Sequence, residues 1–269
     1  LDATTGALVA WNAIASNTVL SIALTDDVVY LAGTFSLMGG EQRSGLAKVD
    51  ATSGSLTPWD PFSDWDCTDV AVSGGTVYVA GNFSTIGAAF RNGLAALDTA
   101  TGLATPWNPD CDGTVHALIG MGQSILVGGD FNSANGTVRH RIASFDALTA
   151  DLDPWDPVAD SSVLALAVSG DRIYVGGSFL SIGGEERDNL AAIDLATGRA
   201  TSWNPGADGV VHSISLASGV LYAGGAFSTM AGQPRSGLAA VTEDGTLTSW
   251  DPAADGPVRV LEQQGNSLY

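Results

Sequence analysis

The sequence predicts an all-β protein built from a repeat of 48 residues. Apolar residues nowhere recur with helical spacing over the length of a helix, while 34 glycines and 10 prolines favour turns. Short apolar runs at 76–79, 125–127 and 173–175 end in small residues, as buried strands do. Tryptophans recur at intervals of 48, 48, 48, 48 and 47 residues, and each is followed by Asn or Asp. They are Trp11, Trp59, Trp107, Trp155, Trp203 and Trp250.

Other residue types recur when positions are counted from each tryptophan as position 0. Position 19 holds Tyr in most repeats and Leu126 in the third, while position 22 holds Gly and position 24 holds Phe. Position 39 holds Asp in four repeats. Position 32 always holds arginine: Arg43, Arg91, Arg139, Arg187 and Arg235.

Each repeat contains four strand signals separated by turns. In the fourth repeat they lie at 164–168, 172–176 and 190–194, and the last strand runs into Trp203, with a Gly-Gly turn at 183–185. Four strands in a period of nearly 50 residues are typical of one blade of a β-propeller, and a helical solenoid does not fit them.

The positions of the two chain ends predict six blades. Five complete repeats are flanked by fragments that complement each other, so segment 258–269 and segment 7–11 are expected to share the closing blade. Pairing the ends would remove the exposed sheet edges that invite aggregation. Residues 1–269 are therefore interpreted as a single propeller domain that is part of a longer chain. The alternative interpretation is that they form an arc of a larger ring.

Composition restricts the partners. A net charge of -19 would repel phosphate backbones and anionic lipid headgroups, so nucleic acid is not expected as a partner. No run approaches the roughly 18 apolar residues of a membrane span, so no membrane insertion is expected.

The repeat resembles two known types. The double glycine that closes the second strand, followed by Asp-x-Ala-Thr-Gly before a strand ending in Trp (194–203), looks like kelch-type blades. The run 125–131 (ILVGGDF), with Arg139 and the Asn-Pro after Trp107, is similar to the delta-60 type repeat of bacterial extracellular propellers. This resemblance covers the whole chain and implies a secreted or cell-surface propeller.

The repeated aromatic and arginine residues are expected to be structural. Aromatic side chains that occupy one position in every repeat favour packing between blades over ligand binding. One arginine per blade, with an Asp at position 39 and an Asn or Asp after each Trp, predicts a repeated set of hydrogen bonds that ties strands or neighbouring blades.

Cys67 and Cys111 lie in neighbouring blades at nearly equivalent positions, which predicts a disulfide between blades; two independent small residues are the alternative. Asn108, Asp110 and Asp112 have the alternating oxygen ligands of a calcium loop. The bidentate Glu of such a loop is missing, and Asx turns explain the spacing without metal. No cofactor is therefore expected, with calcium as the single candidate.

Motifs for chemistry are scarce. The sequence has no nucleophile elbow, no phosphate-binding loop before a helix and no histidine pair with metal-ligand spacing. Carboxylates are abundant, so a glycosidase that uses an Asp or Glu pair stays an alternative, although no single pair stands out.

Departures from the repeat are better candidates for function than the repeated residues. Trp65, between Asp64 and Asp66, occupies a connection where other repeats hold small or polar residues. Phe90 lies in another connection, and His140 with Arg141 replaces the usual small pair after Arg139. In a four-stranded blade these connections emerge on one face, called here the loop face.

The sequence therefore predicts an extracellular, noncatalytic interaction module that binds a glycan or a protein through its loop face. The alternatives are a polysaccharide-acting enzyme with loop-face carboxylates, and an architectural unit of an adhesin, fibre or envelope array, for which self-assembly is expected.

Overall fold

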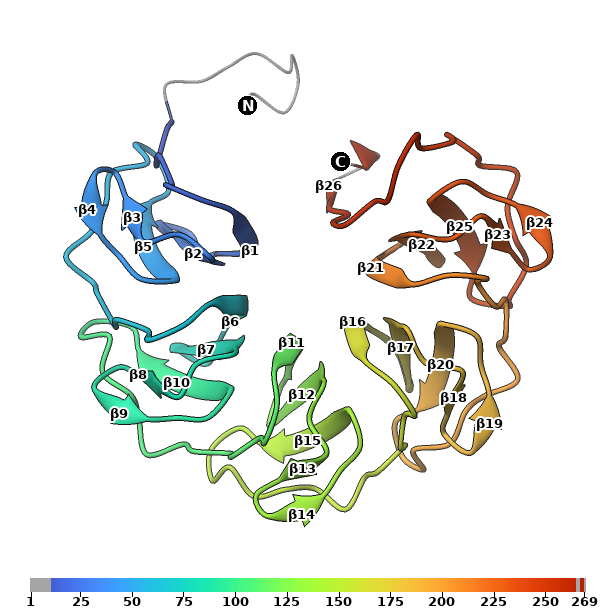
Figure 1. Ribbon diagram of the computed structural model, residues 1–269, viewed down its shortest axis with the longest axis horizontal. Helices are drawn as coiled ribbons and strands as arrows, with labels where there is room; N and C mark the ends of the chain where they lie inside the picture. The colour runs from blue at the N-terminus through green and yellow to red at the C-terminus, as the bar shows by residue number, and fades with distance from the viewer. Residues whose placement is uncertain (1–10, 265–266, 269) are drawn as a thin grey trace. The chain divides into compact units, whose positions relative to one another are not determined.

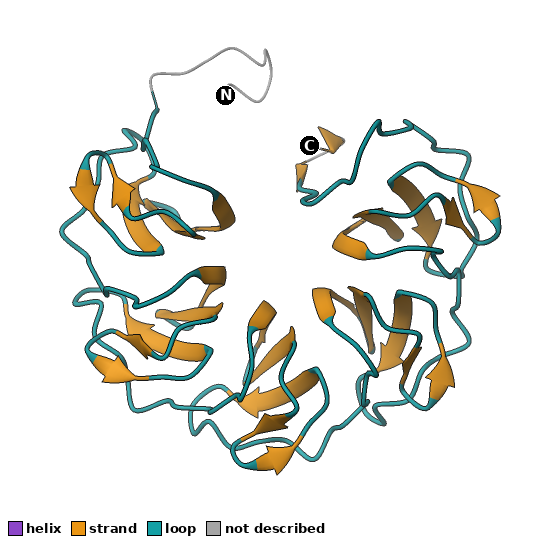
Figure 2. Ribbon diagram, viewed as in Figure 1, coloured by secondary structure: helices purple, strands orange, loops and turns teal. Residues whose placement is uncertain are grey.

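The computed structural model describes residues 11–264 and 267–268. Within these residues the chain is all-β, and no helix is long and apolar enough to cross a membrane. The described residues form five three-stranded and six two-stranded antiparallel sheets (Figure 2), and none of these sheets closes on itself. The chain divides into two compact units, Leu1–Asp110 (unit 1) and Cys111–Tyr269 (unit 2), and each is described by itself.

Unit 1 contains two repeats with the same strand order (Figure 1). Three longer strands form a sheet, and two short strands form a hairpin between the second and third of them. Repeat 1 contains β1 (Val19–Leu24), β2 (Val28–Gly33), β3 (Leu37–Met38), β4 (Glu41–Gln42) and β5 (Leu46–Asp50). Repeat 2 contains β6 (Cys67–Ser73), β7 (Thr76–Gly81), β8 (Thr85–Ile86), β9 (Ala89–Phe90) and β10 (Leu94–Asp98).

Unit 2 contains three more repeats of this kind and a terminal hairpin. Repeat 3 contains β11 (Val115–Met121), β12 (Ser124–Gly129), β13 (Ser133–Ala134), β14 (Thr137–Val138) and β15 (Ile142–Asp146). Repeat 4 contains β16 (Val163–Ser169), β17 (Arg172–Gly177), β18 (Ser181–Ile182), β19 (Glu185–Glu186) and β20 (Leu190–Asp194). Repeat 5 contains β21 (Val211–Ala217), β22 (Val220–Gly225), β23 (Thr229–Met230), β24 (Gln233–Pro234) and β25 (Leu238–Thr242), and the hairpin contains β26 (Gln263–Gln264) and β27 (Ser267–Leu268).

A β-bulge in the first strand of every repeat explains the glycine at position 22. In repeat 4 the pairing steps from Val163 opposite Gly177 to Ala165 opposite Gly176. A Cβ atom on Gly177 would lie 2.1 Å from the carbonyl oxygen of Ser162, which is a severe clash with backbone. In the other four repeats the equivalent distance is 2.1–2.3 Å. Only glycine permits this close approach of two strands.

The short hairpin was not anticipated from the sequence as a pair of strands. In repeat 4 its two central residues, Gly183 and Gly184, have φ angles of 65° and 83°. Positive φ at both central residues is the geometry of a type I′ turn, whose twist matches that of the strands it joins. The predicted turn at 183–185 therefore closes a hairpin of two-residue strands, which are too short for a hydrophobic alternation to reveal.

The sequence predicts a fourth strand in every repeat, but the structure has only an isolated bridge at that place in each of the five repeats. Before Trp59 and its four later counterparts, the segment pairs with the third strand through one isolated bridge, as Leu56 does with Val49. In repeat 1 the Thr57 amide still donates to the Lys48 carbonyl oxygen at 2.9 Å. The next residue is Pro58, which has no amide hydrogen to continue the ladder. Repeats 2 and 3 also have proline there, and repeats 4 and 5 keep the single bridge with serine instead.

The repeated tryptophans connect adjacent repeats. In unit 1 the Trp59 ring packs edge-on against Tyr30 of repeat 1, with centroids 5.3 Å apart. Its indole nitrogen donates to the carbonyl oxygen of Asp98 in repeat 2 at 3.0 Å. In unit 2, Trp203 makes the same two contacts with Tyr174 and Thr242. The hydrophobic core accordingly lies between neighbouring sheets, and the tryptophans are part of it.

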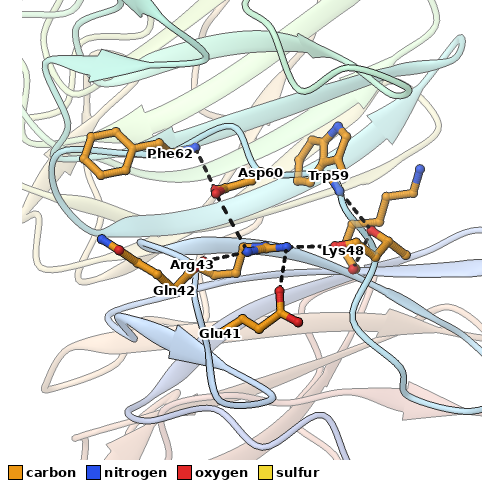
Figure 3. Close-up of polar contacts among 8 residues, drawn as sticks. Glu41, Gln42, Arg43, Lys48, Trp59, Asp60 and Phe62 are labelled. Carbon is orange, nitrogen blue, oxygen red and sulfur yellow. Dashed lines mark hydrogen bonds and ion pairs between the residues drawn. The ribbon is translucent and has the colours of Figure 1, made fainter.

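Each arginine at position 32 fastens the end of its own repeat. Arg43 donates through Nη1 to the carbonyl oxygen of Gln42 at 2.6 Å and through Nη2 to that of Thr57 at 2.9 Å (Figure 3). Its carboxylate neighbours are Asp60, at 3.8 Å, and Glu41, at 3.6 Å. The other four arginines make the same two carbonyl contacts.

The Asp at position 39 has a different task from the one expected. Asp50 Oδ1 accepts hydrogen bonds from the amides of Thr52 and Ser53, at 3.1 and 2.7 Å, and so closes the turn after β5. These hydrogen bonds, led by the Ser53 hydroxyl, lower the pKa of Asp50. The arginines instead contact backbone carbonyl oxygens and the Asp that follows the tryptophan. Asp50 is not among these partners, because its carboxylate accepts the hydrogen bonds of its own turn.

The N-terminal part of the predicted closing blade, residues 7–10, lies outside the described residues. At the other end, segment 258–264 covers repeat 5 of unit 2: the Val258 amide donates to the Gly225 carbonyl oxygen at 3.0 Å, and the Leu261 amide donates to Ser213 Oγ at 3.0 Å. Closure of a ring, and a single domain over residues 1–269, stay predictions.

Candidate functional site

Two aromatic side chains that the sequence singled out are exposed in unit 1. Trp65 lies in the connection that enters β6 and is 63% exposed, and Phe90 lies at the end of β9 and is 83% exposed. Neither residue occupies a position whose side chain is buried in the other repeats. Core packing therefore gives no reason for an aromatic residue at either place. Exposed large aromatic residues are typical of contact surfaces.

The backbone brings the segments of these residues into one small sheet. Ser63 bridges Ile86 of β8, and Thr85 of β8 pairs with Phe90 of β9. The Asp64 amide also donates to the Thr85 carbonyl oxygen at 3.1 Å. The connection that contains Trp65 therefore lies beside the hairpin that contains Phe90.

Asp64 holds this arrangement together. Its Oδ1 accepts hydrogen bonds from the amides of Ser84 and Thr85, both at 2.9 Å. Asp112, Asp160 and Asp208 make the equivalent pair of contacts in unit 2, so this carboxylate belongs to the repeat. Asp64 was predicted as a binding residue, and the structure gives it a positioning role. Asp66 is exposed beside Trp65.

Phe62 is a second exposed aromatic residue of the connection that contains Trp65, and the sequence reasoning missed it. It is 52% exposed and has a φ angle of 41°. Its amide donates to Asp60 Oδ1 at 3.3 Å, and Asp60 in turn faces Arg43 (Figure 3). The signal was available, because the residue three places after the tryptophan is apolar in several repeats, and Ile14 and Val158 are exposed there as well. Phe62, Trp65 and Phe90 are called the aromatic surface below.

The other sequence candidates, His140 and Arg141, belong to unit 2. Arg141 occupies a position where three repeats have glycine, and its φ angle is 68°, a strained conformation for an arginine. Its guanidinium donates to the carbonyl oxygen of Asp130. The His140 carbonyl oxygen accepts from the Ala159 amide at 3.2 Å. That these residues share one face with Trp65 and Phe90 stays a prediction.

Asp130 is the centre of a polar cluster in unit 2. Its Oδ2 lies 2.8 Å from His116 Nε2, and its Oδ1 accepts a hydrogen bond from the Ser162 hydroxyl. Burial raises the pKa of Asp130, but the hydrogen bonds from Ser162 and His116 outweigh it, so the pKa is lowered. The serine contacts the carboxylate and not the imidazole, so this is not the order Ser-His-Asp of a hydrolase triad.

Both cysteines are buried, and no bond joins their sulfurs here. Because they belong to two units that are described separately, the disulfide between them stays a prediction. Cys67 belongs to unit 1 and Cys111 to unit 2. The sulfur of Cys67 fills the space beside Gly45, 3.3 Å from where a Cβ atom on that glycine would lie. Burial raises the pKa of the Cys67 thiol to about 12. Cys67 thus takes the place of the valine found at its position in other repeats.

One of the three calcium candidates, Asp112, accepts hydrogen bonds that hold the backbone of its repeat. Asp112 Oδ1 accepts from the amides of Asn132 and Ser133, at 2.7 and 2.9 Å, as its counterparts in other repeats do. Among the described residues, no three His, Cys, Asp or Glu side chains are grouped so that they could hold a metal ion.

Comparisons with known proteins add information on the fold alone. No protein-family model and no curated protein matches the chain. Among solved structures 547 chains match, one of them the crystal structure of the computationally designed Ika8 protein in its first crystal packing in P63. That match has a TM-score of 0.60 and 14% identity, and it covers 93% of this chain and 66% of the Ika8 chain. The computationally designed Ika4 protein matches with a TM-score of 0.45 and 15% identity over 67% of this chain and 92% of its own.

Proposed function

We propose that this chain is a six-bladed β-propeller of the kelch-like or delta-60 type that binds a glycan or a protein. The five equivalent three-stranded sheets support the architecture. The start of a sixth blade is supported by Val258, whose Cγ1 lies 2.8 Å from where a Cβ atom on Gly224 would be. Val211 contacts Gly176 in the same way one repeat earlier.

The observation that carries the binding function is the exposure of Trp65 and Phe90 on the aromatic surface of unit 1. Indole and phenyl rings supply a large contact area with few rotamers to fix, which is why aromatic residues dominate binding energies at interfaces. Asp66, beside Trp65, supplies a carboxylate that accepts hydrogen bonds from hydroxyl or amide groups of a ligand. The resemblance to extracellular propeller repeats supports an extracellular or cell-surface location.

The test is a binding screen of the whole chain against a glycan array, with the variants Trp65→Ala and Phe90→Ala in parallel. We expect at least one glycan class to bind and both variants to lose tenfold or more of the affinity. Because both side chains are exposed, the melting temperatures of the variants should stay within about 1 °C of the parent.

Leu148→Ala is the matched control, since Leu148 is an exposed apolar residue of unit 2 and should keep full binding. Binding that survives both aromatic substitutions, or a large loss of stability in Trp65→Ala, contradicts the proposal. Release of reducing ends from a bound glycan would support the enzyme alternative instead.

A further inference from the structure

Unit 2 contains a cavity of about 490 Å³ between repeats 3 and 4. This volume lies in the range of about 300–1,000 Å³ that is usual for small-molecule sites. The cavity adjoins β12 and β15 of repeat 3 and the turn that follows β20 of repeat 4. Its lining includes Leu126, Ser144, Asp153, Trp155, Asp156 and Thr197.

The cavity lies where repeat 3 lacks the tyrosine of the other repeats. Tyr30, Tyr78, Tyr174 and Tyr222 each pack edge-on against a tryptophan, with centroids 5.0–5.4 Å apart. In repeat 3 this position is Leu126, whose side chain has no ring to place beside Trp155. Trp155 is consequently half-buried and its indole nitrogen is 3.4 Å from its carbonyl acceptor, whereas Trp203 is buried and makes that contact at 3.0 Å.

Two further departures from the repeat line the same cavity. Ser144 pairs directly with Leu126 across the ladder, at a position that holds alanine in three repeats and Lys48 in repeat 1. Asp153, two residues before Trp155, stands where the other four repeats have threonine. The buried Ser144 hydroxyl donates to Asp153 Oδ2. One repeat has thus lost a ring and gained a hydroxyl and a carboxylate at the same place.

The chemistry of the lining selects a ligand class. Trp155 offers an apolar ring, and Asp153 and Asp156 offer carboxylate oxygens that accept hydrogen bonds. The lining contains hydroxyl groups but no lysine, arginine or histidine, and the guanidinium of Arg139 behind Asp156 is already engaged with that carboxylate, at 3.7 Å, and with two carbonyl oxygens. The lining therefore disfavours an anion. A ligand that fits has one apolar face and several hydroxyl donors, as a pyranose ring has. We propose that this cavity binds one neutral hexopyranose unit, independently of the aromatic surface of unit 1.

The experiment uses saturation-transfer NMR on the whole chain with the methyl glycosides of glucose, galactose, mannose and N-acetylglucosamine. We expect at least one to bind with a dissociation constant near 1 mM, about −4 kcal/mol. Leu126→Tyr should abolish the transfer, because the tyrosine ring would pack edge-on against Trp155, as its counterparts do in four repeats, and would cover the indole ring that the sugar needs. The variant is expected to fold, since tyrosine occupies this position in four repeats. L126Y/S144A/D153T, which restores the full pattern of the other repeats, is the second variant.

Tyr174→Leu is the matched control. It opens the equivalent gap beside Trp203, but next to Ala192 and Thr201, so it should create no sugar site. All glycoside measurements are made in a chain that carries Trp65→Ala, so that the aromatic surface does not contribute and the transfer reports on this cavity alone. The inference is overturned if none of the four glycosides binds, if binding survives both refilled variants, or if phenol or a primary amine binds and the glycosides do not.

Discussion

Each arginine at position 32 donates hydrogen bonds to two carbonyl oxygens of its own repeat. One belongs to the residue before it, and the other lies in the segment before the next tryptophan. Arg187 is 9% exposed and donates to the carbonyl oxygens of Glu186, at 2.6 Å, and Thr201, at 2.5 Å. The Thr201 carbonyl lies in the segment whose pairing with β20 is a single bridge. A planar guanidinium reaches both oxygens at once, whereas an ammonium cannot.

Arg187→Lys should therefore destabilise the protein by about 1–3 kcal/mol, because it leaves one buried carbonyl without its donor. Urea denaturation followed by tryptophan fluorescence measures the change. Arg199→Lys is the control, since Arg199 is exposed, and it should change the free energy of unfolding by less than about 0.5 kcal/mol. Equal effects of the two substitutions would contradict the proposed role.

The buried thiols provide a second prediction for single residues. The pKa of Cys67 is raised to about 12 by burial, so thiolate is scarce near neutral pH and alkylation should be slow. Intact mass spectrometry after iodoacetamide treatment should show no added groups in the native protein and two after denaturation without reductant. A protein that adds none after denaturation contains the disulfide. Because the folded pKa is raised above 9.0, this group's contribution to stability is complete below pH 9 and is lost as pH rises towards 12.

At the scale of elements, the contact between the first two strands of each repeat depends on a missing side chain. Gly177→Ala would place a methyl group 2.1 Å from the Ser162 carbonyl oxygen and 3.0 Å from the buried Phe179 ring, so neither neighbour can move aside easily. We expect a loss of about 2–4 kcal/mol, measured by thermal and urea denaturation. Gly256→Ala, where no atom lies within 4 Å of the new methyl group, should have no measurable effect.

In repeats 2 to 5 one carboxylate holds each short hairpin, whereas in repeat 1 the Ser16 hydroxyl takes its place. Asp208 accepts from the amides of Ser228 and Thr229 at 2.7 and 2.8 Å and from the Ser228 hydroxyl, and these hydrogen bonds, the hydroxyl first, lower its pKa to about 2. Because the folded pKa is depressed, its contribution to stability is present above pH 3.8 and is lost as pH falls towards 2. Asp208→Asn should lower the melting temperature at pH 6 and flatten its decline below pH 4. Asp26→Asn is the exposed control and should leave both unchanged.

The sequence predicted the long strands and the packing positions well, because burial of both faces produces runs such as 173–175 that need no context. It did not predict the loss of the fourth strand, to which proline contributes in repeats 1 to 3 only, nor the hairpins of two-residue strands. The cavity beside Trp155 also escaped prediction. In the sequence, leucine at position 126 in place of tyrosine looks like an exchange of two core residues. Its effect becomes visible only when the structure shows that Trp155 is the ring that the tyrosine would have contacted.

At the scale of the whole molecule, the last residues of the chain protect the final repeat. Leu261 is buried, and Val258 packs against Gly224 as a neighbouring repeat would. Deleting residues 258–269 would expose the β21 side of repeat 5 and remove one buried and one half-buried aliphatic side chain, about 2–4 kcal/mol. We expect a lower melting temperature and aggregation, measured by calorimetry and light scattering. Deleting only 263–269 should keep the protein monodisperse, and aggregation of both truncations to the same degree would contradict this role.

The Tyr–Trp contact that recurs in four repeats has a consequence for how such a chain acquires new sites. Since each repeat contacts only its neighbours, repeat 3 could lose its ring and gain Ser144 and Asp153 while the other repeats kept the fold stable. Leu126, Ser144 and Asp153 lie within one period of 48 residues, so a single repeat that carries all three can replace another repeat. A chain with such a site in several repeats would offer several ligand contacts to one polymer, and its avidity would rise by effective concentration without any stronger single contact.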